Sequence, residues 1–141
     1  MGADEQVVVE HEVKVDASPE TVFSFLADAE KVSSWWGRAQ KVDARPGGSL
    51  EVEFPDQGAR MVGEFVEIQA PTRLVFTFGF DGHPTLPPGS TRVEITLRAD
   101  GAGTVLKLAH RDLPASEETV IRQGWEAYLS RLAEVASVAS V

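Results

Sequence analysis

The chain has 141 residues and a net charge of −9, because 22 acidic residues outnumber 13 basic ones. This balance argues against nucleic acids and anionic membrane surfaces as partners, since both are bound through clustered Lys and Arg. The sequence has no cysteine and no apolar run of membrane-spanning length, which excludes disulfides, thiolate metal sites, a cysteine nucleophile and membrane insertion.

The first part of the chain predicts one strand followed by two short helices. Apolar and polar residues alternate over residues 7–15, as is typical of a half-buried strand. Ser18 is a suitable N-cap, and the proline after it suits the first position of a helix. A second short helix is expected over residues 28–34, directly before Trp35 and Trp36.

Six further strands are predicted between residues 42 and 110. Each has alternating apolar residues, and the turns between them contain Gly, Pro and Asp. Short loops between successive strands imply antiparallel pairing. Residues 81–89 form a longer loop rich in Gly and Pro, which is either the entrance lid of a binding site or an ordinary hairpin loop.

A long amphipathic helix is predicted after residue 115. A lone helix with a wide apolar face must pack on a sheet, so the pattern predicts an α+β fold. We expect a single domain over residues 1–141 with a core at about 7–138. The acidic N-terminus does not resemble a secretory signal, and the expected location is cytoplasmic. The apolar face of the helix carries Ile121, Trp125, Tyr128, Leu129 and Leu132.

Several short motifs follow one another with a specific order and spacing. They are Ala17-Ser18-Pro19-Glu20-Thr21-Val22-Phe23, Trp35-Trp36-Gly37, Pro46-Gly47-Gly48, Gly63-Glu64, Ala70-Pro71-Thr72-Arg73-Leu74-Val75-Phe76, Thr104-Val105-Leu106-Lys107-Leu108, Leu113-Pro114, and Gly124-Trp125 with Tyr128-Leu129 and Leu132. Together they resemble the START-like, SRPBCC helix-grip superfamily, in the branch related to the C-terminal domain of the activator of heat shock protein 90 ATPase. The resemblance implies a seven-stranded antiparallel sheet wrapped around the long C-terminal helix. It also implies two short helices after the first strand, and a cavity between sheet and helix.

Aromatic residues at inward positions are the candidate ligand-binding residues. Either they line an apolar pocket or they fill a solid core, since aromatic side chains bury large areas. Trp35 and Trp36 are expected to diverge, so that one anchors the short helices and the other reaches the mouth of the pocket. The ligand-binding set is Trp35, Trp36, Phe54, Phe76, Phe78, Phe80, His110, Trp125, Tyr128 and Leu129.

The histidines are the main candidates for polar chemistry. His11 and His110 fall at inward strand positions, and the fold implied by the resemblance makes their strands neighbours. Each is either a polar handle that orients a ligand or moves a proton, or a hydrogen-bonded core histidine. His83 lies in the 81–89 loop and is expected to be solvated. The histidines are far apart in sequence, no nucleophile–base pair is visible, and no metal or cofactor is expected.

Three functions remain open at this point. The leading hypothesis is a small cytoplasmic protein that binds a hydrophobic or amphipathic small molecule between sheet and helix. The resemblance also suggests a chaperone-interacting protein with a role in the stress response. The third hypothesis is a cavity-based enzyme such as a cyclase or hydrolase. A second copy of the chain, forming a homodimer, is a further candidate partner.

Overall fold

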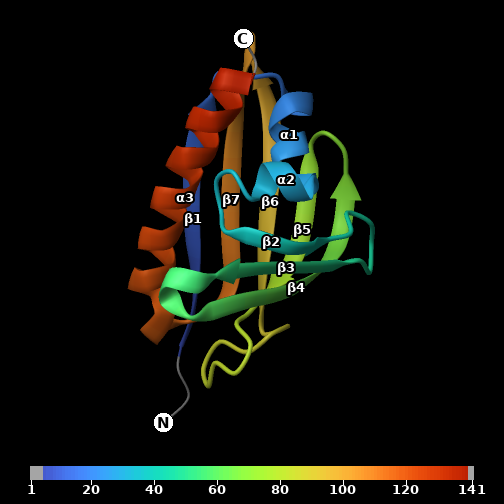
Figure 1. Cartoon of the computed structure of the whole chain (residues 1–141). Coiled ribbons are helices and arrows are strands. Elements are labelled where there is room, and N and C mark those ends of the chain that lie inside the picture. Colours follow the sequence, from blue (N-terminus) through green and yellow to red (C-terminus); the bar gives the residue numbers. More distant parts are fainter. Residues whose placement is uncertain (1–4, 140–141) are drawn as a thin grey trace.

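The computed structural model describes residues 5–139, in which a seven-stranded antiparallel sheet packs against a long C-terminal helix (Figure 1). This confirms the predicted α+β helix-grip fold. The outermost residues of the predicted domain, 1–4 and 140–141, lie outside the described range. The elements are β1 (Gln6–Val15), α1 (Pro19–Ala27), α2 (Ala29–Val32), β2 (Arg38–Val42), β3 (Ser49–Phe54), the 3₁₀ turn η1 (Pro55–Gln57), β4 (Ala59–Gln69), β5 (Arg73–Phe78), β6 (Thr91–Asp100), β7 (Gly103–Pro114), the 3₁₀ turn η2 (Ala115–Glu117) and α3 (Glu118–Ala139).

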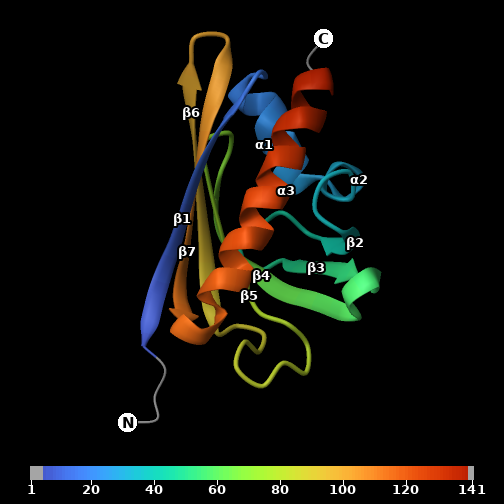
Figure 2. The same ribbon diagram turned by 90° about the vertical axis from the view of Figure 1, so that its left-hand side faces the viewer.

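The strand order is β1-β7-β6-β5-β4-β3-β2, so the first and last strands pair, as the resemblance implied. The sheet is strongly curved. Figure 2 shows β2, β3 and the start of β4 standing well away from β1, β6 and β7. Helix α3 lies on the concave side and packs next to β1. The curvature therefore leaves a space that the helix must fill.

The bend in the sheet has a local cause in β4. A Cβ atom on Gly63 would lie 2.1 Å from the carbonyl oxygen of Thr77, so only glycine allows the two strands to approach this closely. Two residues further on, the β4–β5 register shifts between Phe65 and Glu67. Register irregularities of this kind bend a strand and increase its twist. This part of β4 thus redirects the sheet around α3.

The first short helix begins at the predicted Ser18 cap, and the second, expected over residues 28–34, spans the shorter range Ala29–Val32. The Ser18 hydroxyl accepts a hydrogen bond from the Thr21 backbone N–H at 3.2 Å, which caps α1. Asp28 ends α1 and caps α2 by accepting from the Glu30 N–H at 3.0 Å. These caps satisfy backbone donors that the first turn of a helix leaves free.

One face of α3 forms the centre of the core. Its buried residues recur every three or four positions, the spacing of one side of a helix. Tyr128 lies on the same side but is only half-buried. Within residues 5–139, no helix is long and apolar enough to cross a membrane. The buried residues of α3 are Ile121, Trp125, Leu129, Leu132 and Ala136.

Candidate functional site: an aromatic cleft beneath the closing helix

A cleft of about 780 Å³ lies beside the first half of α3. Its other walls are the turn that contains η1, the C-terminal ends of β3 and β5, and the start of the 81–89 loop. Exposed residues such as Gln57 and Val120 are part of the lining, so the cleft opens to solvent. The sheet curvature and the helix together create this space.

Six aromatic side chains form the apolar walls of the cleft. Most of their rings meet at tilted or edge-to-face angles, and Trp36 and Phe78 are stacked with their centroids 6.4 Å apart. The ring centroids of Trp36 and Trp125 are 5.4 Å apart, and those of Phe54 and Tyr128 are 5.7 Å apart. The members are Trp36, Phe54, Phe78, Phe80, Trp125 and Tyr128, all of them in the set expected from the sequence.

The tryptophan pair has divided roles, although the two rings do not diverge. Trp35 donates its indole N–H to the carbonyl oxygen of Phe25 at 2.8 Å and is 2% exposed, so it anchors α1 to the core. Trp36 lines the cleft. The two rings stack almost parallel, with centroids 5.4 Å apart. The expectation that they point in different directions is wrong, because both rings lie in the core.

Four residues of the expected ligand-binding set lie outside the cleft lining: Trp35, Phe76, His110 and Leu129. Each is at most 2% exposed and belongs to the packed core or its edge. Phe76, for example, packs against both Trp36 and Phe65. These residues support the wall rather than form its surface. Whether any of the ten residues contacts a ligand stays a prediction.

Both ring nitrogens of His110 are hydrogen-bonded within the core, so neither is free to bind a ligand. Its Nδ1 accepts the indole N–H of Trp125 at 2.9 Å. The Thr91 hydroxyl donates to the carbonyl oxygen of Phe78 at 2.6 Å, so the His110 Nε2–H must donate to Thr91 Oγ1 at 2.8 Å. Burial lowers the pKa of His110 to about 3, which keeps the ring neutral.

The other two histidines are placed differently from each other. His11 is half-buried on β1 and pairs with Leu108, while Val9 pairs with His110. The strands of His11 and His110 are therefore neighbours, as expected, but His11 is not part of the cleft lining. His83 was expected to be solvated; its side chain is 32% exposed and lines the cleft, which opens to solvent.

The 81–89 loop holds His83 in a defined position at the cleft mouth. His83 Nδ1 accepts two backbone N–H groups, from Thr85 at 3.2 Å and from Leu86 at 3.0 Å. Leu86 is 1% exposed, and its carbonyl oxygen accepts the Phe80 N–H at 2.7 Å. The loop is therefore tied to the core and forms a wall of the cleft.

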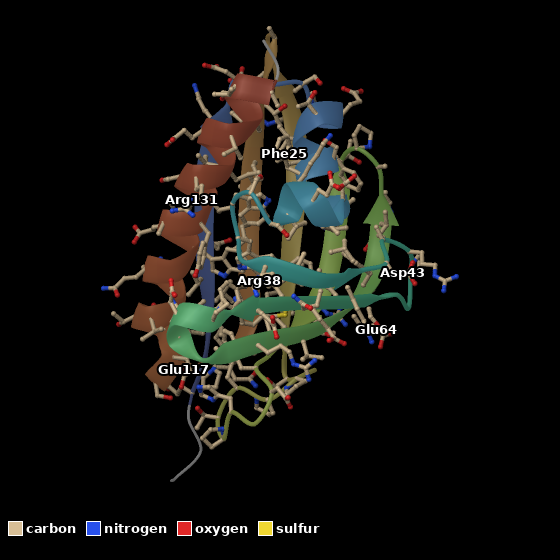
Figure 3. All side chains as sticks on the ribbon, in the orientation of Figure 1. Phe25, Arg38, Asp43, Glu64, Glu117 and Arg131 are labelled. Atoms are coloured by element: carbon tan, nitrogen blue, oxygen red, sulfur yellow. The ribbon has the colours of Figure 1, made fainter. Side chains whose placement is uncertain are left out.

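Glu117, in the turn before α3, faces this loop (Figure 3). One carboxylate oxygen accepts the Thr85 hydroxyl at 2.8 Å. The other lies 4.0 Å from His83 Nε2. Neither His83 nor Glu117 was expected at a site. The pairing depends on how a loop folds against a helix start 34 positions later in the sequence, and no local pattern encodes it.

The charges around the mouth are acidic or already paired. Asp81 lines the cleft and forms an ion pair with Arg60 at 3.0 Å, and Arg60 also contacts Glu51 at 2.7 Å. These two carboxylates raise the pKa of Arg60. Among residues 5–139, no group of three or more His, Asp or Glu side chains is arranged to hold a metal ion.

A curved seven-stranded antiparallel sheet that grips one long helix, with an apolar cleft between them, is the architecture of the START-like, SRPBCC helix-grip proteins. The family model for activator of Hsp90 ATPase homolog 1-like proteins matches residues 16–137. The chain therefore belongs to that family, which confirms the branch suggested by its motifs.

Solved structures agree with this assignment. An AHSA1-like protein from Rhizobium etli is 37% identical, with a TM-score of 0.69 over 94% of this chain and 83% of that one. DynU16, a protein in the dynemicin biosynthetic locus, is 25% identical with a TM-score of 0.80. That match covers 94% of this chain and 48% of DynU16, so this chain spans about half the length of that relative.

A more distant relative shares the fold alone. The Aha1 dimer from Colwellia psychrerythraea is 14% identical, with a TM-score of 0.79 over 96% of this chain and 99% of that one. A comparison with curated proteins finds no match.

Proposed function

We propose that this protein binds a planar, largely apolar small molecule in the cleft beside the first half of α3. The observation that carries the proposal is the aromatic lining of a cleft of about 780 Å³. Small-molecule sites commonly have volumes of about 300–1,000 Å³, apolar walls and a few polar groups. The cleft has each of these properties. The wall residues are held by their packing on the core, so the site is preformed.

The neutral fluorophore N-phenyl-naphthylamine offers a direct test, because it is flat, apolar and brightens in apolar surroundings. We expect it to bind the parent protein. Gly124 allows a matched variant to be designed: a Cβ atom there would approach Tyr128 Cε2 only to 3.8 Å, and the residue lines the cleft. Gly124→Leu should therefore be accepted by the backbone, place an apolar side chain in the cleft between the aromatic walls, and weaken binding by at least about tenfold.

Ser130→Leu is the matched control, because it adds the same side chain to an exposed position of α3 outside the cleft lining. Its affinity for the fluorophore should equal that of the parent. Circular dichroism should show both variants folded. Failure of the parent to bind, or equal binding by the Gly124→Leu variant, would remove the cleft as the binding site.

A second candidate function is interaction with a chaperone, which is favoured by membership in the activator of Hsp90 ATPase homolog 1-like family. Its test is independent of the cleft: the protein is added to purified Hsp90 and ATP turnover is measured. Stimulated turnover would support the interaction. An unchanged rate together with the absence of a complex by size-exclusion chromatography would reject it.

An enzymatic role has less support. His110, the sequence's main candidate for moving protons, has both ring nitrogens engaged within the core. We therefore propose a binding protein without catalysis as the primary function. We further propose that the chain forms a single domain and is cytoplasmic. We also propose that it forms a homodimer, because the Colwellia relative is a dimer. Its check is the mass in solution by light scattering.

A further inference from the structure

The His83–Glu117 pair at the cleft mouth has a specific pattern of donors and acceptors. His83 Nδ1 accepts two backbone N–H groups, so the ring proton of the neutral side chain lies on Nε2. The side chain therefore presents a donor on the side that faces Glu117. Glu117 presents an acceptor there, the carboxylate oxygen that does not bind Thr85. A donor and an acceptor thus face each other.

The distance between these two atoms is suited to a third group. His83 Nε2 and Glu117 Oε1 are 4.0 Å apart, which is too long for a hydrogen bond between them. One oxygen atom about 2.8 Å from each would bridge the gap, with the two bonds at roughly a right angle. A hydroxyl group matches both partners at once, because it donates to the carboxylate and accepts from the imidazole N–H. An ether oxygen matches only the imidazole.

The lining also disfavours acidic ligands. Among the described residues, those that line the cleft include no Lys and no Arg, whereas Asp81 and Glu117 both lie at its mouth. An anionic ligand would be repelled by the Glu117 carboxylate, which no Lys or Arg of the lining offsets, whereas Arg60 offsets the charge of Asp81. The surrounding wall is aromatic, with the Phe80 ring centroid 6.1 Å from that of His83. A neutral ligand with a hydroxyl group on an aromatic ring can pack against the aromatic walls and hydrogen-bond to both His83 and Glu117.

We infer that His83 and Glu117 select a hydroxyl group on a planar aromatic ligand, and thereby determine the specificity of the cleft. This inference rests on the proposed function and names the ligand class of the same site. The ligand's ring system lies among the aromatic walls, and its hydroxyl lies between the two side chains. Thr85 orients the carboxylate through its hydroxyl, while the backbone N–H groups of the loop orient the imidazole.

The test compares naphthol with its methyl ether by isothermal titration calorimetry at neutral pH. The two compounds share the same ring system, but the ether cannot donate a hydrogen bond to Glu117. Hydrogen bonds to charged groups are the stronger kind. The parent protein should therefore bind naphthol at least about tenfold more tightly than the ether. Naphthalene carboxylate, an anion of similar size, should bind more weakly than either.

Two variants assign the separate roles. Glu117→Gln keeps the size of the side chain but gains a donor for the ether oxygen, so the preference should fall to within about twofold. His83→Asn keeps an acceptor for the loop N–H groups but lacks the Nε2 donor. It should weaken both compounds similarly and leave the preference intact. Glu118→Gln is the control, because this neighbouring carboxylate lies outside the cleft lining and is paired with Arg122, so both affinities should stay unchanged.

The outcomes separate this inference from the proposed function. Equal affinity of the parent for naphthol and the ether, with both blocked by Gly124→Leu, would overturn the hydroxyl selection and keep the cleft. A preference that survives in the Glu117→Gln variant would also overturn it. Binding of neither compound, together with no binding of N-phenyl-naphthylamine, would overturn both proposals.

Discussion

The two halves of α3 differ in how completely the rest of the protein covers them, although both bury residues of the inward face. In the second half, Leu129, Leu132 and Ala136 are completely buried. In the first half, Val120 is 66% exposed and Tyr128 is half-buried beside the cleft. Helix α1 packs on α3 and lies beside its second half (Figure 2), whereas no comparable element in the described chain covers the first half. A single amphipathic helix can therefore close a core at one end and line a binding site at the other.

Because one half of α3 is covered and the other lines the cleft, we expect residues of the covered half to stabilise the fold and residues of the other half to contact a ligand. At the closed end, the Ser137 hydroxyl accepts the Asp16 N–H at 3.2 Å and ties the helix to the end of β1. At the open end, Glu117 of the turn η2, directly before the helix, faces the 81–89 loop. Substitutions at the closed end should change stability, and those at the open end should change binding. Three predictions test this separation, in order of decreasing effect.

The largest effect is expected at the closed end. Leu132→Ala removes a completely buried side chain, and such substitutions usually cost about 2–5 kcal/mol of unfolding free energy. Urea denaturation measures this change. The affinity of the folded variant for N-phenyl-naphthylamine should be unaltered. Arg131→Ala, at the exposed neighbouring position, should change stability by less than about 0.5 kcal/mol. Loss of N-phenyl-naphthylamine binding by a Leu132→Ala variant that is still folded would contradict the separation of the two ends.

A second effect concerns His110, between the two regions. Its folded pKa of about 3 lies below the ordinary value of 6.5, so the unfolded chain binds the proton more readily. Stability from this residue is present above pH 6.5 and is lost as the pH falls toward 3. Between pH 7 and pH 4 the loss should be about 3 kcal/mol.

His110→Gln isolates this contribution, because glutamine offers an acceptor and a donor but does not titrate in this range. Urea denaturation of both proteins at pH 7 and pH 4 cancels the effect of the shared carboxylates. The stability difference between parent and variant should shrink by about 3 kcal/mol at the lower pH. An unchanged difference would mean that His110 does not stay neutral in the folded protein.

The smallest effect is expected at Gly124 in the open half. Glycine within a helix is less favourable than alanine by about 1 kcal/mol. A Cβ atom at this position meets nothing closer than 3.8 Å. Gly124→Ala should therefore raise the unfolding free energy by up to about 1 kcal/mol while leaving most of the cleft open. Thermal unfolding followed by circular dichroism measures the gain, and a destabilised variant would show that the glycine is needed for packing.

Periodicity in the sequence predicted the strands, the α+β class and the aromatic residues that share an inward face, while the helix-grip arrangement came from the resemblance of the motifs to a known superfamily. Alternation placed Phe78 and Phe80 on one strand face, and helical spacing placed Trp125 and Tyr128 on one helix face. These rules depend only on the regular geometry of strands and helices. They could not separate cleft residues from core residues: Phe76 shares the parity of Phe78 but lies behind the lining.

The polar part of the site required the structure. The partners of His110, Thr91 and Trp125, lie 19 and 15 positions away in sequence, so its hydrogen bonds depend on tertiary packing. His83 was predicted to be solvated because loops usually lie at the surface. Its contacts with the loop backbone and its position opposite Glu117 follow from the way the loop folds back on the core.

Amide chemical-shift mapping with N-phenyl-naphthylamine tests most directly whether α3 has one binding half and one closed half. Glycine amides report on both regions. The shifts should concentrate at Gly58, Gly82 and Gly124, which line the cleft, and should be small at Gly103 and at Ala136 of the closed half. Shifts centred on Ala136 and its neighbours, with little change at Gly124, would contradict it.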